Sequence, residues 1–282
     1  MEKYIVVLRP RPATSHPGPS HEELAGHLHH FAQALADIDM VMDVWFTHTT
    51  GPAPSSMLPL RTGPAGCLSV RMRHAEDADS RDSGRRLLVE AGAPDLPGFS
   101  GIYRATEALP VRYDRDWPDG APTPGVCLLT FFHRRPCLDY TKFIRRWHVG
   151  HTGLSLRLHP LWHYNRNVVD QVVAPDTARI PGQASLDGSD VPPFDGIVEE
   201  HFRRRDDLLN PFRFYGRFPA ILWNMLTILV DILGFIDLRR IETYLTRETI
   251  VKSSAEGGAR SVATTALPSR DRVRADPFPS ES

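Results

Sequence analysis

The feature that most constrains the fold is the order in which short apolar strands and amphipathic helices follow one another. The first half predicts strand, helix, strand, strand, helix and strand at residues 4–8, 20–37, 40–48, 67–72, 82–91 and 99–103. Alternating or β-branched runs mark the strands, and apolar residues at helical spacing mark the helices. This is the order of the ferredoxin-like fold.

The same order returns in the second half. It predicts a strand at 126–132, a helix at 138–151, strands at 162–169 and 194–202, interrupted helix at 206–233 and a strand at 242–251. A sheet with helices on one face leaves the other face bare, and two such sheets can cover each other. We therefore predict an α+β chain in which two ferredoxin-like units stack as an intramolecular dimeric α/β barrel around a cavity.

This organisation divides the chain into four parts. Residues 1–109 form the first unit, and the Pro-, Asp- and Gly-rich stretch 110–124 is the predicted linker. Residues 125–252 form the second unit. From residue 253 the chain has almost no large apolar side chain before Phe278, so residues 253–282 are predicted to be a disordered tail.

Composition excludes several classes of function. A net charge of −1 gives no electrostatic reason to expect nucleic acid or a membrane as a partner. The three cysteines contain no CxxC pair, which favours a reducing compartment and a cytoplasmic location. The longest apolar run, residues 218–236, is interrupted by Pro219 and Asp231, so we predict a core helix, with a bilayer span as the alternative.

Common cofactor motifs are missing from the sequence. It contains no GxGxxG, no GxxxxGK[ST], no GxSxG and no HExxH. The histidines at 27, 29 and 30 have no carboxylate or cysteine at ligand spacing, which indicates a solvated helix face. We expect neither a cofactor nor a metal ion.

Proton-active side chains gather between residues 127 and 167. His151 follows Trp147 by about one helical turn, so both project from one face, and a neutral imidazole exchanges protons near pH 7. We predict that His151 is a general acid or base. The alternative is a structural histidine bonded to the loop after the helix. His148 lacks a further metal ligand at a defined spacing and is predicted to be partly exposed.

The strand that follows carries Tyr164 and Asn167. Tyr164 is placed to donate a hydrogen bond to a developing enolate or phenolate, although a tyrosine in a sheet also serves packing. Alternation along a strand puts Tyr164 and Arg166 on one face, and Asn165 and Asn167 on the other. These side chains therefore cannot all face one cavity.

Three carboxylates of the next strand are also candidates. Asp195 either orients the imidazole of His151 or closes the turn that Asp-Gly pairs favour. Glu199 and Glu200 are adjacent, so only one of them can face a cavity.

Residues 125–252 resemble the EthD family of dimeric α/β-barrel proteins, which is named after ether degradation. The resemblance rests on Arg134-Arg135-Pro136, Phe143, Trp147 and His151 at F-x-x-x-W-x-x-x-H spacing, Leu154, Pro160, Tyr164-Asn165-Arg166-Asn167, Phe194-Asp195-Gly196-Ile197, Asp231, Phe235, Asp237 and Glu248. It implies paired ferredoxin-like units that act on small organic molecules without a tightly held metal or nucleotide. Related barrels include cofactor-independent monooxygenases, polyketide cyclases, decarboxylases and dehydratases.

The first unit lacks the family's histidine. When Ser20 is aligned with Asp139 as a helix start, the paired positions are Leu24 with Phe143, Leu28 with Trp147, and Ala32 with His151. The apolar positions are kept and the histidine is not. We therefore expect a degenerate first unit and one active cavity for the pseudo-dimer.

Together these observations predict an EthD-domain oxidoreductase, a cofactor-independent monooxygenase of small aromatic, polyketide-like or ether-pathway molecules. His151, Tyr164 and Asp195 are the predicted catalytic residues. The predicted substrate contacts are Trp147, Asn167, His148 and Phe132. A lyase (cyclase, dehydratase or decarboxylase) and a non-catalytic binder are the alternatives. The expected partner is a small-molecule substrate, and further homo-oligomerisation is left open.

Overall fold

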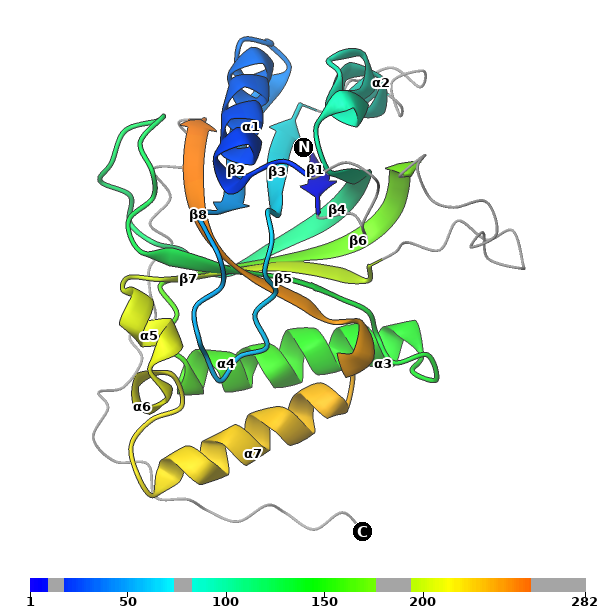
Figure 1. The fold of residues 1–282 in the computed structure, drawn as a ribbon. Helices are drawn as coiled ribbons and strands as arrows, with labels where there is room; N and C mark the ends of the chain where they lie inside the picture. Colours follow the sequence, from blue (N-terminus) through cyan, green and yellow to red (C-terminus); the bar gives the residue numbers. More distant parts are fainter. Residues whose placement is uncertain (10–17, 74–82, 176–193, 255–282) are drawn as a thin grey trace.

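Eight antiparallel strands form one closed barrel within the residues that the computed structural model describes, 1–9, 18–73, 83–175 and 194–254 (Figure 1). The strands are β1 Glu2–Leu8, β2 Val41–Thr49, β3 Gly66–Met72, β4 Phe99–Val111, β5 Val126–Phe132, β6 His163–Pro175, β7 Gly196–Phe202 and β8 Glu242–Lys252. Their order around the barrel is β1-β3-β2-β8-β5-β7-β6-β4. The predicted α+β class and the closed barrel are confirmed.

The two halves of the chain contribute equivalent arcs of the barrel. Strands β1 to β4 follow the order β4-β1-β3-β2, and strands β5 to β8 follow the matching order β8-β5-β7-β6. The arcs join where β2 pairs with β8 and where β4 pairs with β6. β4 is longer than predicted and runs to Val111, through the first two residues of the predicted linker.

Helices cover the barrel on two opposite sides (Figure 1). One side holds α1 His21–Ala36, α2 Ser83–Glu90 and the short η2 Ala93–Asp95. The other side holds α3 Tyr140–Arg145, the π-helical η3 Arg146–His151, α4 Thr152–Leu158, α5 Arg205–Leu209, α6 Pro211–Phe214, α7 Ala220–Leu233 and η4 Leu238–Arg240. The helix predicted at 138–151 thus continues to Leu158.

The cover over the first arc is closely packed. Ser20 begins α1 with a capping box, in which the Glu23 N–H donates to Ser20 Oγ at 3.1 Å and the Ser20 N–H donates to Glu23 Oε2 at 2.7 Å. Leu24, Leu28 and Ala32 are buried against the outer faces of the strands. The predicted apolar ladder of this helix is therefore its packing face.

The interior of the barrel is filled by alternate strand residues. Ile5, Leu129, Phe131, Ile197 and Tyr244 belong to one buried cluster of inward-facing side chains. Aromatic residues dominate its volume, and Phe131 lies 5.0 Å from Phe194 between ring centroids. The cavity described below lies outside the barrel, between the strands and the helices, and not inside the barrel as the sequence predicted.

The apolar run at 218–236 forms α7, and only one side of this helix is packed. Ile221 and Ile228 are buried, whereas Leu222 and Trp223 are 64% and 69% exposed. The predicted core helix is therefore buried only on the side of α7 that carries Ile221 and Ile228. Among the described helices, none is both long enough and apolar enough to cross a membrane.

Gly196 provides a test of the packing behind the second arc. A Cβ at this position would lie 2.4 Å from Phe132 Cζ and 2.8 Å from Trp147 Cη2, and both side chains are buried. We expect Gly196→Ala to lower the free energy of unfolding by about 1–3 kcal/mol, measured by urea unfolding. Gly26→Ala is the control, because no atom lies within 4 Å there and α1 should gain about 0.5–1 kcal/mol. An unchanged Gly196→Ala protein would contradict the close packing.

Candidate functional site

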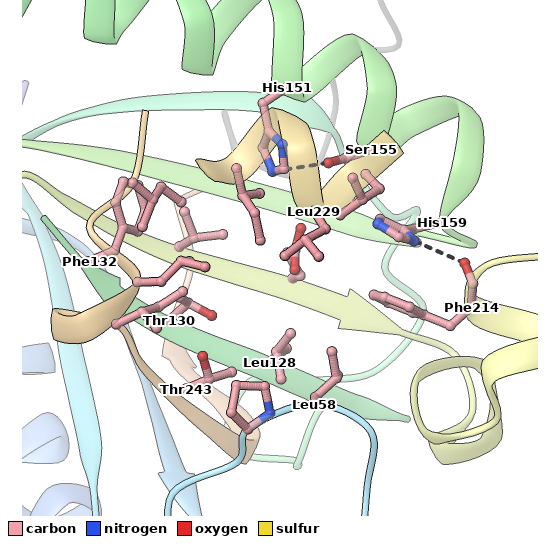
Figure 2. Close-up of a pocket in the computed structure, with 18 of the residues that line it drawn as sticks. Leu58, Leu128, Thr130, Phe132, His151, Ser155, His159, Phe214, Leu229 and Thr243 are labelled. Atoms are coloured by element: carbon pink, nitrogen blue, oxygen red, sulfur yellow. Dashed lines mark hydrogen bonds between the residues drawn. The ribbon is translucent and has the colours of Figure 1, made fainter. Parts of the chain in front are cut away.

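A cavity of about 410 Å³ lies between the outer face of the second arc and the helices η3, α4 and α7 (Figure 2). Its walls are mainly apolar. Leu128, Phe132 and Val198 line it from the strands, and Ile228 and Ile232 line it from α7. A cavity of this size and character suits a small organic molecule with few polar groups.

His151 lies at the end of η3 and faces this cavity. Its Nδ1 is 2.7 Å from Asp231 Oδ2 on α7, and its Nε2 is 3.3 Å from Ser155 Oγ on α4. Because a carboxylate only accepts, Nδ1 carries the proton in the neutral ring and Nε2 is the basic nitrogen. Asp231 thereby fixes both the tautomer and the orientation of the imidazole.

The sequence of contacts Asp231–His151–Ser155 matches the order of a hydrolase triad. The setting of the serine differs. In a nucleophile elbow the serine is exposed at a sharp turn between a strand and a helix. Ser155 is fully buried within α4, where its carbonyl accepts the His159 N–H at 2.8 Å. We therefore regard Ser155 as a hydrogen-bond partner of His151 and not as a nucleophile.

A π-helical turn aligns the aromatic and polar residues of this wall. In η3 the Thr152 N–H donates to the carbonyl of Trp147, five residues earlier. Trp147, His151 and Ser155 then all line the cavity, each four residues after the last. The predicted shared face of Trp147 and His151 agrees with this placement.

Glu200 adds a buried carboxyl group to the opposite wall. Burial raises its pKa to about 7, and the nearby charge of His151 acts in the other direction. Such a group exchanges protons at neutral pH. Its neighbour Glu199 points into the barrel, where Oε2 accepts from Asn165 Nδ2 at 3.0 Å. As predicted, only one of the two glutamates faces the cavity.

Tyr164 is the cross-strand partner of Glu200 and lines the same cavity. Burial is the main cause that raises the pKa of its phenol, and the charge of Glu200 adds to this effect. The side chain is therefore a neutral hydrogen-bond donor at neutral pH.

The other predicted site residues divide between this cavity and other places. Trp147 and Phe132 line it. Asn167 points into the barrel, as the alternation predicted, and its Nδ2 donates to the Ile197 carbonyl at 3.1 Å. His148 is not part of the lining. Its ring centroid lies 4.9 Å from that of Trp147, and burial lowers its pKa to about 4.

Asp195 also lies away from the cavity lining. Its Oδ2 accepts the Arg134 N–H at 2.9 Å, and its Oδ1 lies 3.5 Å from Arg134 Nε. This is the turn-closing arrangement that the sequence left as the alternative. The carboxylate beside His151 is Asp231, eighty positions along the chain.

Three residues of the site were not among the predicted catalytic and substrate-contact residues: Asp231, Ser155 and Glu200. Ser155 follows His151 by one helical turn, and this spacing by itself predicts that the two side chains share a face of the helix. Glu200 could also be predicted in part, because strand alternation allows only one of Glu199 and Glu200 to face a cavity. Across the described segments, no group of His, Cys, Asp and Glu side chains is arranged to hold a metal ion.

Comparison with known proteins places the fold but not the family. No known family model matches the chain, and no curated protein resembles it in sequence. Among solved structures, an anthrone oxidase-like protein matches with a TM-score of 0.50 and 8% identity, covering 89% of this chain and 91% of that one. At this identity the likeness shows a shared fold alone.

Two further solved structures are more distant. A candidate monooxygenase from Lactobacillus acidophilus NCFM has a TM-score of 0.45 at 10% identity, covering 90% of this chain and 96% of that one. Chlorite dismutase from Candidatus Nitrospira defluvii has a TM-score of 0.35 at 8% identity, covering 88% and 90%. Similarities of this strength do not bear on the reaction.

The raised pKa of Glu200 makes a prediction about stability. The folded protein binds a proton at Glu200 more tightly than the unfolded chain does, so its stability should fall as pH rises from about 4.5 to 7. Glu200→Gln removes this dependence and should raise the free energy of unfolding at about pH 8 by about 1–3 kcal/mol. Urea unfolding at about pH 5 and 8 measures the difference.

Glu90→Gln, on the exposed side of α2, is the matched control for this experiment. It should leave the pH dependence of unfolding as it is in the wild type. Equal curves for the wild type and Glu200→Gln would show that the carboxyl group is well solvated in the cavity.

Proposed function

We propose that this protein is an oxidoreductase that oxidises a small, largely apolar ring compound with molecular oxygen and without a cofactor. The observation that carries the proposal is the meeting of two proton-exchanging groups in one apolar cavity. These are His151, held by Asp231, and Glu200, whose pKa burial raises to about 7. An apolar wall with convergent titratable groups is a common setting for proton abstraction beside a carbonyl.

The first step removes a proton from carbon. His151 Nε2 takes it from a carbon next to a ketone or a phenolic ring, and Asp231 stabilises the imidazolium that results. The substrate's electron pair moves onto its oxygen as an enolate. Tyr164 and the protonated form of Glu200 donate hydrogen bonds to this oxygen, where negative charge develops.

The second step uses molecular oxygen as the oxidant. The enolate gives one electron to oxygen, and the radical pair combines into a carbon–oxygen bond. The resulting peroxide anion takes the proton back from the His151 imidazolium and becomes a hydroperoxide. Loss of water from a CH–OOH group converts it into a ketone. Overall one CH₂ group and one O₂ molecule become one C=O group and one water. Without oxygen, the same enolate leads to cyclisation, dehydration or decarboxylation, which is the lyase alternative.

We further propose that the chain consists of two fused ferredoxin-like units, residues 1–109 and 125–252. In this proposal the second unit belongs to the EthD family. The equal strand order of the two arcs supports the two fused units. Ala32, the counterpart of His151, is fully buried against the sheet, which supports a first unit that serves as scaffold. In this proposal Asp231 positions the imidazole. Asp195, Asn167 and His148 have no chemical role because they lie outside the cavity lining.

Anthrone is a suitable first substrate because its CH₂ group lies between two aromatic rings and opposite a ketone. We expect oxygen consumption and quinone formation by the wild type in air. His151→Ala should lower kcat about 10²- to 10⁴-fold, the usual contribution of a general base. Asp231→Asn should lower it as well, because an amide can donate to Nδ1 and leave the proton on Nε2, which then cannot act as the base. Asp195→Asn, outside the cavity, is the control and should keep wild-type activity.

The same assay separates the alternatives. Equal turnover by wild type and His151→Ala would remove His151 from the mechanism. Product that still forms under argon would identify a lyase. Tight binding of the ring compound without turnover in either gas would identify a binder.

The pH profile tests the role of Glu200. Because its protonated form is the donor, kcat should fall as pH rises through about 7, where the carboxyl group ionises. Glu200→Gln keeps an N–H donor at all pH values, so its profile should lose this descending limb. A rising limb in the wild-type profile that Glu200→Gln abolishes would instead make the carboxylate the base.

A further inference from the structure

The outward side of α7 is an exposed apolar surface. Of the fourteen large apolar side chains exposed in the described segments, eight lie between residues 212 and 233. Six of them lie on α7 and form the α7 apolar face: Leu222, Trp223, Leu226, Leu229, Val230 and Leu233. Leu229, at the edge of this face, also lines the cavity. Phe212 on α6 and Phe218 precede the helix in the chain. Trp223, Leu222 and Val230 are 60% exposed or more. A contiguous surface of this kind marks a site of contact with a partner or a membrane.

The helix cannot turn this surface inward, because its other side is apolar as well. Met225, Ile228 and Ile232 line the cavity from the inner side of α7. In Figure 1 the helix lies below α4, at the lower edge of the described part of the molecule. A helix that is apolar all round is normally enclosed on every side. Within the described residues, no second apolar contact covers the outward side of α7.

Positive charge surrounds this surface. Within residues 140–158 and 211–240 there are eight lysines and arginines and two aspartates. All eight cations are exposed: Lys142, Arg145, Arg146, Arg157, Arg213, Arg217, Arg239 and Arg240. Two of them are engaged within the chain, since Arg213 Nη1 pairs with Asp207 Oδ1 at 3.0 Å and Arg146 Nη1 donates to the Gly234 carbonyl at 2.6 Å. Asp231 is bonded to His151, and Asp237 accepts the Arg239 N–H at 3.2 Å. The net charge of −1 for the whole chain conceals this local excess.

We propose that the α7 apolar face rests on an anionic lipid surface, with the helix lying in the plane of the interface. Trp223 and Phe218 would enter the boundary of the acyl chains, and the surrounding arginines would meet the headgroups. The fourteen residues of α7 are too few to span a bilayer, which takes about twenty. The contact is therefore peripheral.

Charge argues against a second copy of the chain as the occupant. Arg213 and Arg217 lie before the start of α7, and Arg239 and Arg240 follow its end. Pairing two α7 helices in either direction therefore brings cations against cations. An anionic surface gains from the same charges, by about 1 kcal/mol for each lysine or arginine near the headgroups. This proposal is independent of the reaction proposed for the cavity.

The test is sedimentation of the full chain with phosphatidylcholine vesicles, with and without phosphatidylserine. We expect binding to the anionic vesicles that weakens as salt is raised. Trp223→Gln combined with Leu226→Gln should weaken binding more than about 10-fold, since neither side chain lines the cavity and both lose apolar area. Arg217→Gln combined with Arg240→Gln should weaken it about 30-fold, at about 1 kcal/mol for each charge.

Val89→Gln is the matched control, because Val89 is an exposed apolar residue of α2 on the opposite side of the barrel. It should bind like the wild type, and thermal unfolding should show that every variant is folded. Failure of the wild type to bind anionic vesicles would overturn the proposal. So would a dimer in analytical ultracentrifugation that the Trp223→Gln and Leu226→Gln variant abolishes, since the face would then hold a second copy.

Discussion

Closure of the barrel is the constraint on which the rest of this structure depends. The pairings of β2 with β8 and of β4 with β6 leave none of the eight strands with a free edge. All inward side chains then share one core, so each outward face needs its own cover of helices. The first arc receives a close-fitting cover from α1. The second receives a longer and more broken set of helices, and the cavity is the space that this set leaves open.

The position of the cavity explains why two adjacent glutamates have different properties. Glu199 points into the closed barrel, where Asn165 donates to it, and Glu200 points to the opposite face, toward the cavity. Burial raises the pKa of both carboxyl groups. Glu200 lines the cavity, so a substrate held there would be in reach of its carboxyl group. The register that pairs Glu200 with Tyr164 sets two outward polar groups next to each other on the cavity wall.

The sequence was sufficient for features that depend on local pattern. Strand alternation separated Tyr164 from Asn167, and helical spacing placed Trp147 and His151 together. It was insufficient for the pairing of His151 with Asp231, because that contact joins helices eighty positions apart and depends on how α7 crosses α4. The sequence pattern favoured Asp195 as the carboxylate that orients His151. In the structure, Asp195 instead accepts a hydrogen bond from the Arg134 backbone N–H. Net charge is an average over the chain, so it could not show that exposed cations lie on the segments next to α7.

Helix α7 joins the features that local pattern could not predict. The same fourteen residues supply Asp231 to the imidazole, apolar side chains to the cavity wall and an exposed apolar face to the outside. The C-terminal end of the helix is held by Arg146, whose Nη1 donates to the Gly234 carbonyl at 2.6 Å, and by Arg135, which donates to the Leu233 carbonyl at 3.1 Å. Asp231 lies in this anchored last turn. The imidazole is thus oriented from the firmly held end of α7. Binding of a partner to the exposed face would therefore affect the site chiefly through the apolar side chains with which α7 lines the cavity.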